Sequence, residues 1–78
     1  MYIRKQVKQT ITSVKRYYEQ NMISEDVCNE LIEKLKNFNF EYRGYSRYNF
    51  TLHFIFWSKW NIYDVIEEKR AEKLFSDN

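Results

Sequence analysis

The only histidine in the sequence, His53, is the side chain best suited to proton transfer, because a free imidazole titrates near neutral pH. It lies on the polar side of an expected strand, beside Asn49 and Thr51. Acid–base catalysis also needs groups that orient the imidazole and bind a reacting atom, and nothing in the sequence completes such a site. We therefore interpret His53 as a structural residue, and an RNase-like toxin is the least favoured of three functional hypotheses.

The single cysteine, Cys28, is the next candidate for chemistry. It is in helical register with Leu31 and Leu35, so we expect a buried and unreactive thiol. One cysteine and one histidine do not have the spacing of a zinc site. Gly44 is the only glycine, which excludes the glycine-rich loops that bind phosphates. The sequence thus predicts no catalytic residue, no metal and no cofactor, and a protein that is not an enzyme.

Tyrosines and arginines are interleaved over residues 42–49, which span the expected connection between two strands. Tyr45, Arg43 and Arg47 are residue types that dominate protein-binding hot spots, and they also stack on bases and clamp phosphates. The alternative is a polar tip without function, since loop tips are often polar. We predict that these three residues contact a protein partner.

Positive charge gathers at the start of the chain, although the net charge is only +2. Residues 1–18 carry five cations and no acid, whereas residues 19–41 carry six acids against two lysines. A nucleic-acid-binding regulator is therefore the second hypothesis, because such cations can contact phosphates. Its candidate residues are Arg4, Lys5, Lys8, Lys15 and Arg16, joined by Arg43 and Arg47.

Two helices are expected before residue 38. Apolar residues at spacings of three and four predict a helix over Tyr2 to Gln20, ended by Asn21, which tolerates a left-handed backbone. Ser24 is the expected N-cap of a second helix that reaches Asn37. Its predicted apolar face comprises Val27, Cys28, Leu31, Ile32 and Leu35.

After Asn37 the apolar period changes from 3.6 to 2, which predicts strands over residues 38–43 and 48–57. A loop of odd length pairs Phe40 with Phe50 on one apolar side. A third helix is expected from about Asn61. The predicted fold class is therefore α+β, in the order α-α-β-β-α, with a two-stranded antiparallel hairpin packed on the helices.

The second strand extends beyond the first, so its end would have an unpaired edge. Ile55 and Trp57 would point outward there, and Trp60 follows. Such an edge is a template for a second copy or a target protein. The competing interpretation is that the third helix folds back and covers this edge. We predict Ile55, Trp57 and Trp60 as protein-contact residues.

Length and composition set the broad class. We expect residues 1–78 to form a single domain, and a homodimer would add apolar burial because a chain this short buries only about 60% of its unfolded surface. The sequence has no apolar run near the roughly 20 residues of a membrane span, and its lone cysteine favours the cytoplasm. Abundant Lys, Asn, Ile, Tyr and Phe suggest an AT-rich genome, such as that of a phage or mobile element. The leading hypothesis is a small binding protein that modulates or inhibits another protein.

Overall fold

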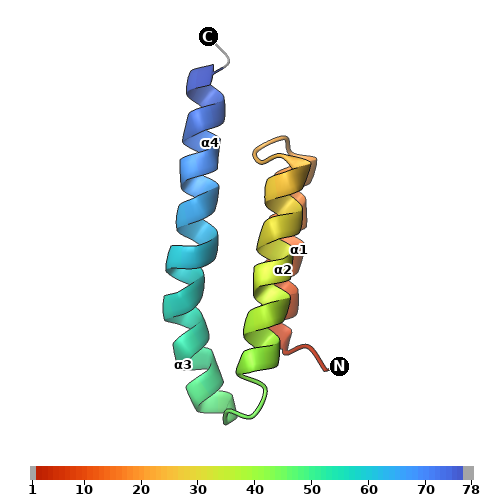
Figure 1. Cartoon of the computed structure of the whole chain (residues 1–78), viewed down its shortest axis with the longest axis vertical. Coiled ribbons are helices and arrows are strands. Elements are labelled where there is room, and N and C mark those ends of the chain that lie inside the picture. The colour runs from red at the N-terminus through yellow and green to blue at the C-terminus, as the bar shows by residue number, and fades with distance from the viewer. Residues whose placement is uncertain (1, 77–78) are drawn as a thin grey trace.

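The protein is a bundle of three helical rods. The computed structural model describes residues 2–76 and measures 47 × 21 × 15 Å along its principal axes. Two rods are α1 (Lys5–Glu19) and α2 (Glu25–Glu41), which pair as a hairpin. The third is continuous and comprises α3 (Arg47–Ser58), the π-helical segment η1 (Lys59–Tyr63) and α4 (Asp64–Ser76). It lies beside the hairpin, with α3 running in the same direction as α1 (Figure 1).

The hairpin of α1 and α2 follows the expectations from sequence. Asn21 has a φ of 61°, which is the left-handed conformation that ends α1. Within residues 2–76 no other residue except glycine has a positive φ, and Gly44 does not have one either. The Ser24 hydroxyl accepts a hydrogen bond from the Val27 N–H at 3.2 Å and caps α2. Cys28, Leu31 and Leu35 are buried on the predicted face. Both helix predictions are confirmed, although α1 is shorter than expected and α2 continues past Asn37.

The predicted hairpin of strands is wrong, because the structure has no strand within residues 2–76 and the fold is all-helical. Residues 38–41 are the last turn of α2, and residues 48–57 belong to α3. An alternating pattern places every second residue on one face, but it also contains pairs four residues apart, which share a face of a helix. Phe50 and Phe54 form such a pair and are buried, whereas Phe40, expected inside the sheet, is 52% exposed.

The connection between the predicted strands is instead the start of a helix. The Ser46 hydroxyl accepts a hydrogen bond from the Asn49 N–H at 3.3 Å, so Ser46 is the N-cap of α3. Gly44 has no positive φ, and a Cβ added there would meet nothing within 4 Å. The predicted helix start at Asn61 is also wrong, because the rod begins at Arg47 and Asn61 lies inside η1.

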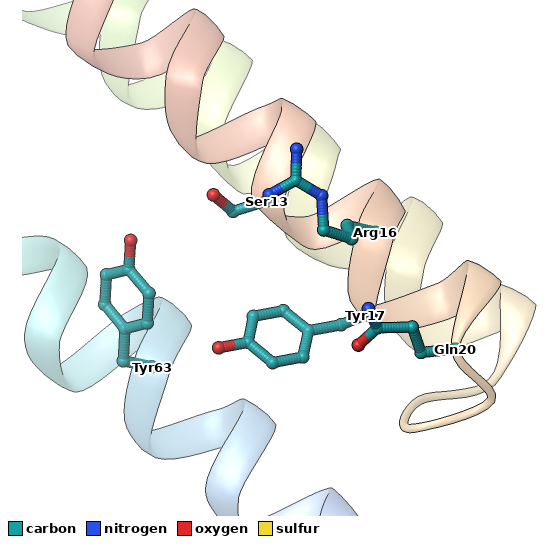
Figure 2. Close-up of a pocket in the computed structure, with 5 residues that line it drawn as sticks. All are labelled: Ser13, Arg16, Tyr17, Gln20 and Tyr63. Atoms are coloured by element: carbon teal, nitrogen blue, oxygen red, sulfur yellow. The ribbon is translucent and has the colours of Figure 1, made fainter.

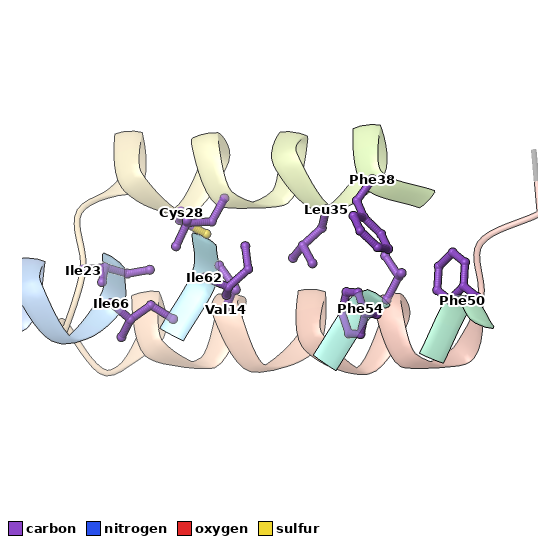
Figure 3. Close-up of a cluster of buried hydrophobic side chains, with 11 residues drawn as sticks. Val14, Ile23, Cys28, Leu35, Phe38, Phe50, Phe54, Ile62 and Ile66 are labelled. Carbon is purple, nitrogen blue, oxygen red and sulfur yellow. The ribbon is translucent and has the colours of Figure 1, made fainter. Parts of the chain in front are cut away.

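The core lies between the hairpin and the long rod (Figure 3). Phe38 is its aromatic centre: its ring lies 5.4 Å from that of Phe50, in an edge-to-face arrangement, and 5.5 Å from that of Phe54. Aliphatic side chains continue the core toward the loop between α1 and α2. The buried apolar residues are Val7, Val14, Ile23, Cys28, Leu31, Leu35, Phe38, Phe50, Phe54, Ile62 and Ile66.

The π-helical segment η1 keeps the core side of the rod in register. A regular α-helix turns by about 100° per residue, so eight residues turn by about 80° more than two full turns. Phe54 and Ile62 are eight residues apart, yet both are buried against the same core. A π-turn accommodates one extra residue and removes most of this rotation. The Asn61 amide donates to the Trp57 carbonyl at 2.9 Å and satisfies a polar group beside the irregularity.

Candidate interaction surface

The side of α3 and η1 that faces away from the hairpin carries large apolar side chains in contact with solvent. We call this surface the outer face. Its members are 43% to 75% exposed, although they are residue types that normally lie inside a protein. The outer face comprises Tyr48, Leu52, Ile55, Phe56 and Trp60.

Helical spacing explains why these side chains lie together. Tyr48, Leu52, Phe56 and Trp60 follow one another at intervals of four, and residues four apart are neighbours on a helix surface. Ile55 stands three residues after Leu52 and joins the same side. The buried residues of α3 occupy other positions, and in Figure 1 the side of the rod away from the hairpin has no helix against it. The rod is thus apolar on two sides, only one of which is covered.

Two of the three contact residues predicted for the end of the second strand lie on the outer face. Ile55 and Trp60 are 57% and 64% exposed. Trp57 is not available, because its ring lies 4.6 Å from that of Phe38 and packs against the core. On a strand, Ile55 and Trp57 would point to the same side. On a helix, residues at positions i and i+2 are about 200° apart, so these two side chains point to different sides. The predicted unpaired strand edge does not exist.

The residues predicted at the tip are brought together only in part. Tyr45 packs on Tyr42 with ring centroids 4.8 Å apart, so it belongs to an aromatic cluster. Arg43 lies over the Phe40 ring, 4.1 Å from its centroid. Arg47 is at the first turn of α3 and lines a different recess from Arg43.

His53 packs beside aromatic rings, and Cys28 lies in the apolar core. The His53 ring lies 5.2 Å from Tyr45 and 5.5 Å from Tyr42 and extends their aromatic cluster. Cys28 is buried, and this burial raises the pKa of its thiol above the ordinary value. Over residues 2–76 we find no group of three His, Cys, Asp or Glu side chains arranged to hold a metal ion, and no helix long and apolar enough to cross a membrane.

The basic residues of α1 divide into two groups. Lys5, Lys8, Lys15 and Arg16 are exposed and have no ion-pair partner in the part of the chain that the structure describes. Arg4 is different, because its guanidinium donates to the Tyr45 carbonyl at 2.6 Å and lies over the Phe50 ring. It therefore fixes the start of the chain to the loop before α3. These intramolecular contacts set Arg4 apart from the four exposed cations of α1.

Arg4, Lys5 and Arg47 line a recess of about 640 Å³ where α1 and α3 begin. Neither helix has an acid in its first turn, so the positive ends of two helix dipoles add to these cations. The Gln6 amide donates to the Thr51 hydroxyl at 2.6 Å and joins the two helices beside the recess. Lys15 and Arg16 lie two or more turns further along α1.

A shallow cleft of about 330 Å³ separates the other end of α1 from η1 (Figure 2). Tyr17 and Tyr63 extend toward one another across it from opposite sides. Ser13, Arg16 and Gln20 complete its lining. A second hollow, of about 390 Å³, is bordered by Phe54, Ile55 and Tyr63. These hollows place hydrogen-bonding groups beside the apolar outer face, as in the polar rim of a protein interface.

Tyr48, Leu52 and Phe56 were not predicted as surface residues, because the alternating pattern placed their side chains on the buried side of a sheet. One signal could have found them. A row of residues at intervals of four from Tyr48 to Trp60 covers one side of a helix, while Phe50 and Phe54 cover another. A single core can take only one of these two rows, so the other must be exposed or must bind a partner.

Comparisons with known proteins add no family: no family model, no curated protein and no solved structure matches the chain.

Proposed function

We propose that this protein acts without catalysis, by binding another protein through the outer face, and that it modulates or inhibits that partner. The observation that supports this proposal is the apolar row itself. Tyr48 is 75% exposed, and Phe56 and Trp60 are 63% and 64% exposed. Large apolar patches on a small protein are a feature of protein-binding surfaces.

The residue types on the outer face favour a protein partner. Tyrosine, tryptophan and phenylalanine are enriched at protein interfaces because each brings a large contact area and has few rotatable bonds. Positions i, i+4 and i+8 on one helix are also how an amphipathic helix binds an apolar groove. The expected partner surface is therefore apolar, and long enough to hold about four turns of α3 and η1.

A capture experiment tests this function. The tagged protein is used as bait in lysate of its natural host, beside a variant with Leu52→Lys and Phe56→Lys. We expect specific partners with the native protein and their loss with the variant, since two buried charges oppose an apolar contact. A matched control carries Lys8→Ala and Lys36→Ala, which change exposed residues off the outer face. Retention of the partners by the outer-face variant would contradict the proposal.

Nucleic-acid binding is the second candidate, and one observation favours it. Lys5, Lys8, Lys15 and Arg16 occupy the solvent side of α1, and Glu19 is the only acid in that helix. Four aligned cations can contact successive phosphates. Because they follow one exposed side of α1, we expect them to contact phosphates rather than bases, so the binding would be independent of sequence.

The two candidates respond to different substitutions. If α1 contacts phosphates, Lys8→Glu with Lys15→Glu abolishes binding to DNA or RNA, and the log of the affinity falls steeply with the log of the salt concentration. The outer-face variant retains that binding. Absence of binding to DNA and RNA at low salt would remove the second candidate.

A further inference from the structure

A row of exposed residues continues from the outer face along the whole rod. Residues at spacings of three or four extend from α3 through η1 into α4, and η1 accommodates the extra residue that would otherwise rotate them apart. All of them are exposed. We call this set the stripe: Tyr48, Leu52, Ile55, Lys59, Tyr63, Glu67, Ala71 and Leu74.

The flanks of the stripe are apolar near its two ends, whereas the exposed charges of Asp64, Glu68 and Arg70 lie beside its middle. Phe56 and Trp60 border its first half, and Phe75, which is 78% exposed, borders its end. Lys73 donates a hydrogen bond to the Asn21 carbonyl, so α4 is held against the loop of the hairpin from its other side. The stripe is therefore exposed along the rod, and Ile55, Lys59 and Tyr63 at its edge beside α1 also line a hollow.

Only two members of the stripe are charged, and they have opposite signs. Lys59 lies four residues before Tyr63, and Glu67 lies four residues after it. If two copies of this rod met in parallel, Lys59 would face Lys59 and Glu67 would face Glu67, which is repulsive at both points. If they met antiparallel around Tyr63, each Lys59 would face a Glu67. The charges thus favour one direction and one register.

We propose that the stripe, which includes part of the outer face, binds a second copy of this chain in an antiparallel pair with its twofold axis near Tyr63. The apolar positions support the same register. Leu52 of one copy meets Leu74 of the other, and Ile55 meets Ala71, because each pair is equally far from Tyr63. A twofold interface must be self-complementary in this way. The long rod then packs on the hairpin on one side and on its copy on the other.

The contact is large enough for a stable dimer. From Leu52 to Leu74 the rod is about 33 Å long at 1.5 Å per residue. The exposed parts of the aromatic and aliphatic side chains along it amount to on the order of 800 Å² per copy, since one buried aromatic side chain alone contributes about 150–250 Å². Stable interfaces bury about 800 Å² per partner. A chain of 78 residues also gains from this burial, because it buries little apolar surface alone.

This inference rests on the proposed function, because both use the apolar side chains of the outer face, and it goes beyond that function by giving the same face a second occupant, another copy of this chain. A different protein that used the same side chains would compete with the second copy. The two claims remain separable: oligomeric state tests the dimer, whereas capture from lysate tests binding to a different protein.

Charge exchange between Lys59 and Glu67 provides the test. Sedimentation equilibrium of the full chain measures the dimer dissociation constant for the native protein, for Lys59→Glu, for Glu67→Lys and for the double variant. We expect a native dimer, a weakening on the order of tenfold in each single variant because two pairs become repulsive, and recovery in the double variant. Lys8→Glu and Glu33→Lys, which make the same changes away from the stripe, should leave the constant unchanged.

Circular dichroism of each variant shows whether the helices remain, so a loss of association can be separated from unfolding. A native protein that is monomeric throughout the concentration range overturns the inference. A native dimer that ignores both single substitutions, or a double variant no better than the singles, overturns the antiparallel register. If the protein is monomeric but captures a different protein through Leu52 and Phe56, the proposed function stands without the dimer.

Discussion

Phe50 and Phe56 should differ sharply when each is replaced by alanine. Phe50 is fully buried, and its ring contacts Phe38, Phe54 and the Arg4 guanidinium. Removing a buried phenylalanine ring costs about 3–5 kcal/mol. The whole domain is expected to have a free energy of unfolding of roughly 4–12 kcal/mol, at about 0.05–0.15 kcal/mol per residue. Phe50→Ala therefore removes a large part of the stability.

Phe56 is 63% exposed, so Phe56→Ala should change the free energy of unfolding by no more than about 0.5 kcal/mol. Urea denaturation followed by far-ultraviolet circular dichroism measures both. Both variants are made in a Lys59→Glu background, which weakens the proposed dimer and leaves folding of the single chain to be measured. If the two substitutions destabilise equally, Phe50 and Phe56 share one face as on a strand, and the helical assignment of residues 47–58 is refuted.

Three further predictions concern the hairpin and the start of the chain. Asn21→Ala should cost about 1 kcal/mol in urea denaturation and Asn21→Gly almost nothing, because the φ of 61° is unfavourable for a residue with a Cβ; equal effects would contradict this. Asn39 is buried, accepts a hydrogen bond from the Arg4 N–H at 3.0 Å and donates one to the Tyr2 carbonyl. Asn39→Ala should therefore lower the free energy of unfolding by about 1–3 kcal/mol. An unchanged urea midpoint would show that these hydrogen bonds do not stabilise the fold. Burial raises the pKa of the Cys28 thiol above its unfolded value, so the contribution of Cys28 to stability is complete below the unfolded pKa and is lost as the pH rises through the folded pKa. Relative to Cys28→Ala, the native protein should therefore lose stability in that alkaline range. A gain in stability there would contradict the raised pKa.

The first half of the fold follows from local signals. Asn21 and Ser24 act at helix ends through their own side chains and backbone, so their roles depend on few distant contacts. The second half depends on packing. Aromatic residues favour strands in general, and between Phe38 and Phe56 they recur at both two and four residues, so the same pattern fits a strand and a helix. In the structure, Phe38, Phe50 and Phe54 are buried in the core, whereas Phe56 is exposed.

The candidate site could be predicted from the sequence only in part. Ile55 and Trp60 were identified as contact residues, but through an expected strand edge that is absent. Trp57 was identified by the same argument and is instead part of the core packing. The π-helical segment η1 gave no signal in the sequence, because it arises where Ile62 must return to the side of the rod that holds Phe54. The continuous stripe can be recognised only once η1 is known.

Photocrosslinking from Phe56 shows directly whether the outer face binds protein. The protein carries a photoreactive phenylalanine analogue at position 56 in its natural host, and a matched sample carries it at Lys8 on the basic side of α1. We predict that irradiation joins position 56 to a protein, either a second copy or a different partner, and that position 8 gives little protein adduct. An absence of adducts from position 56, with adducts to protein or nucleic acid from position 8, would contradict protein binding through the outer face.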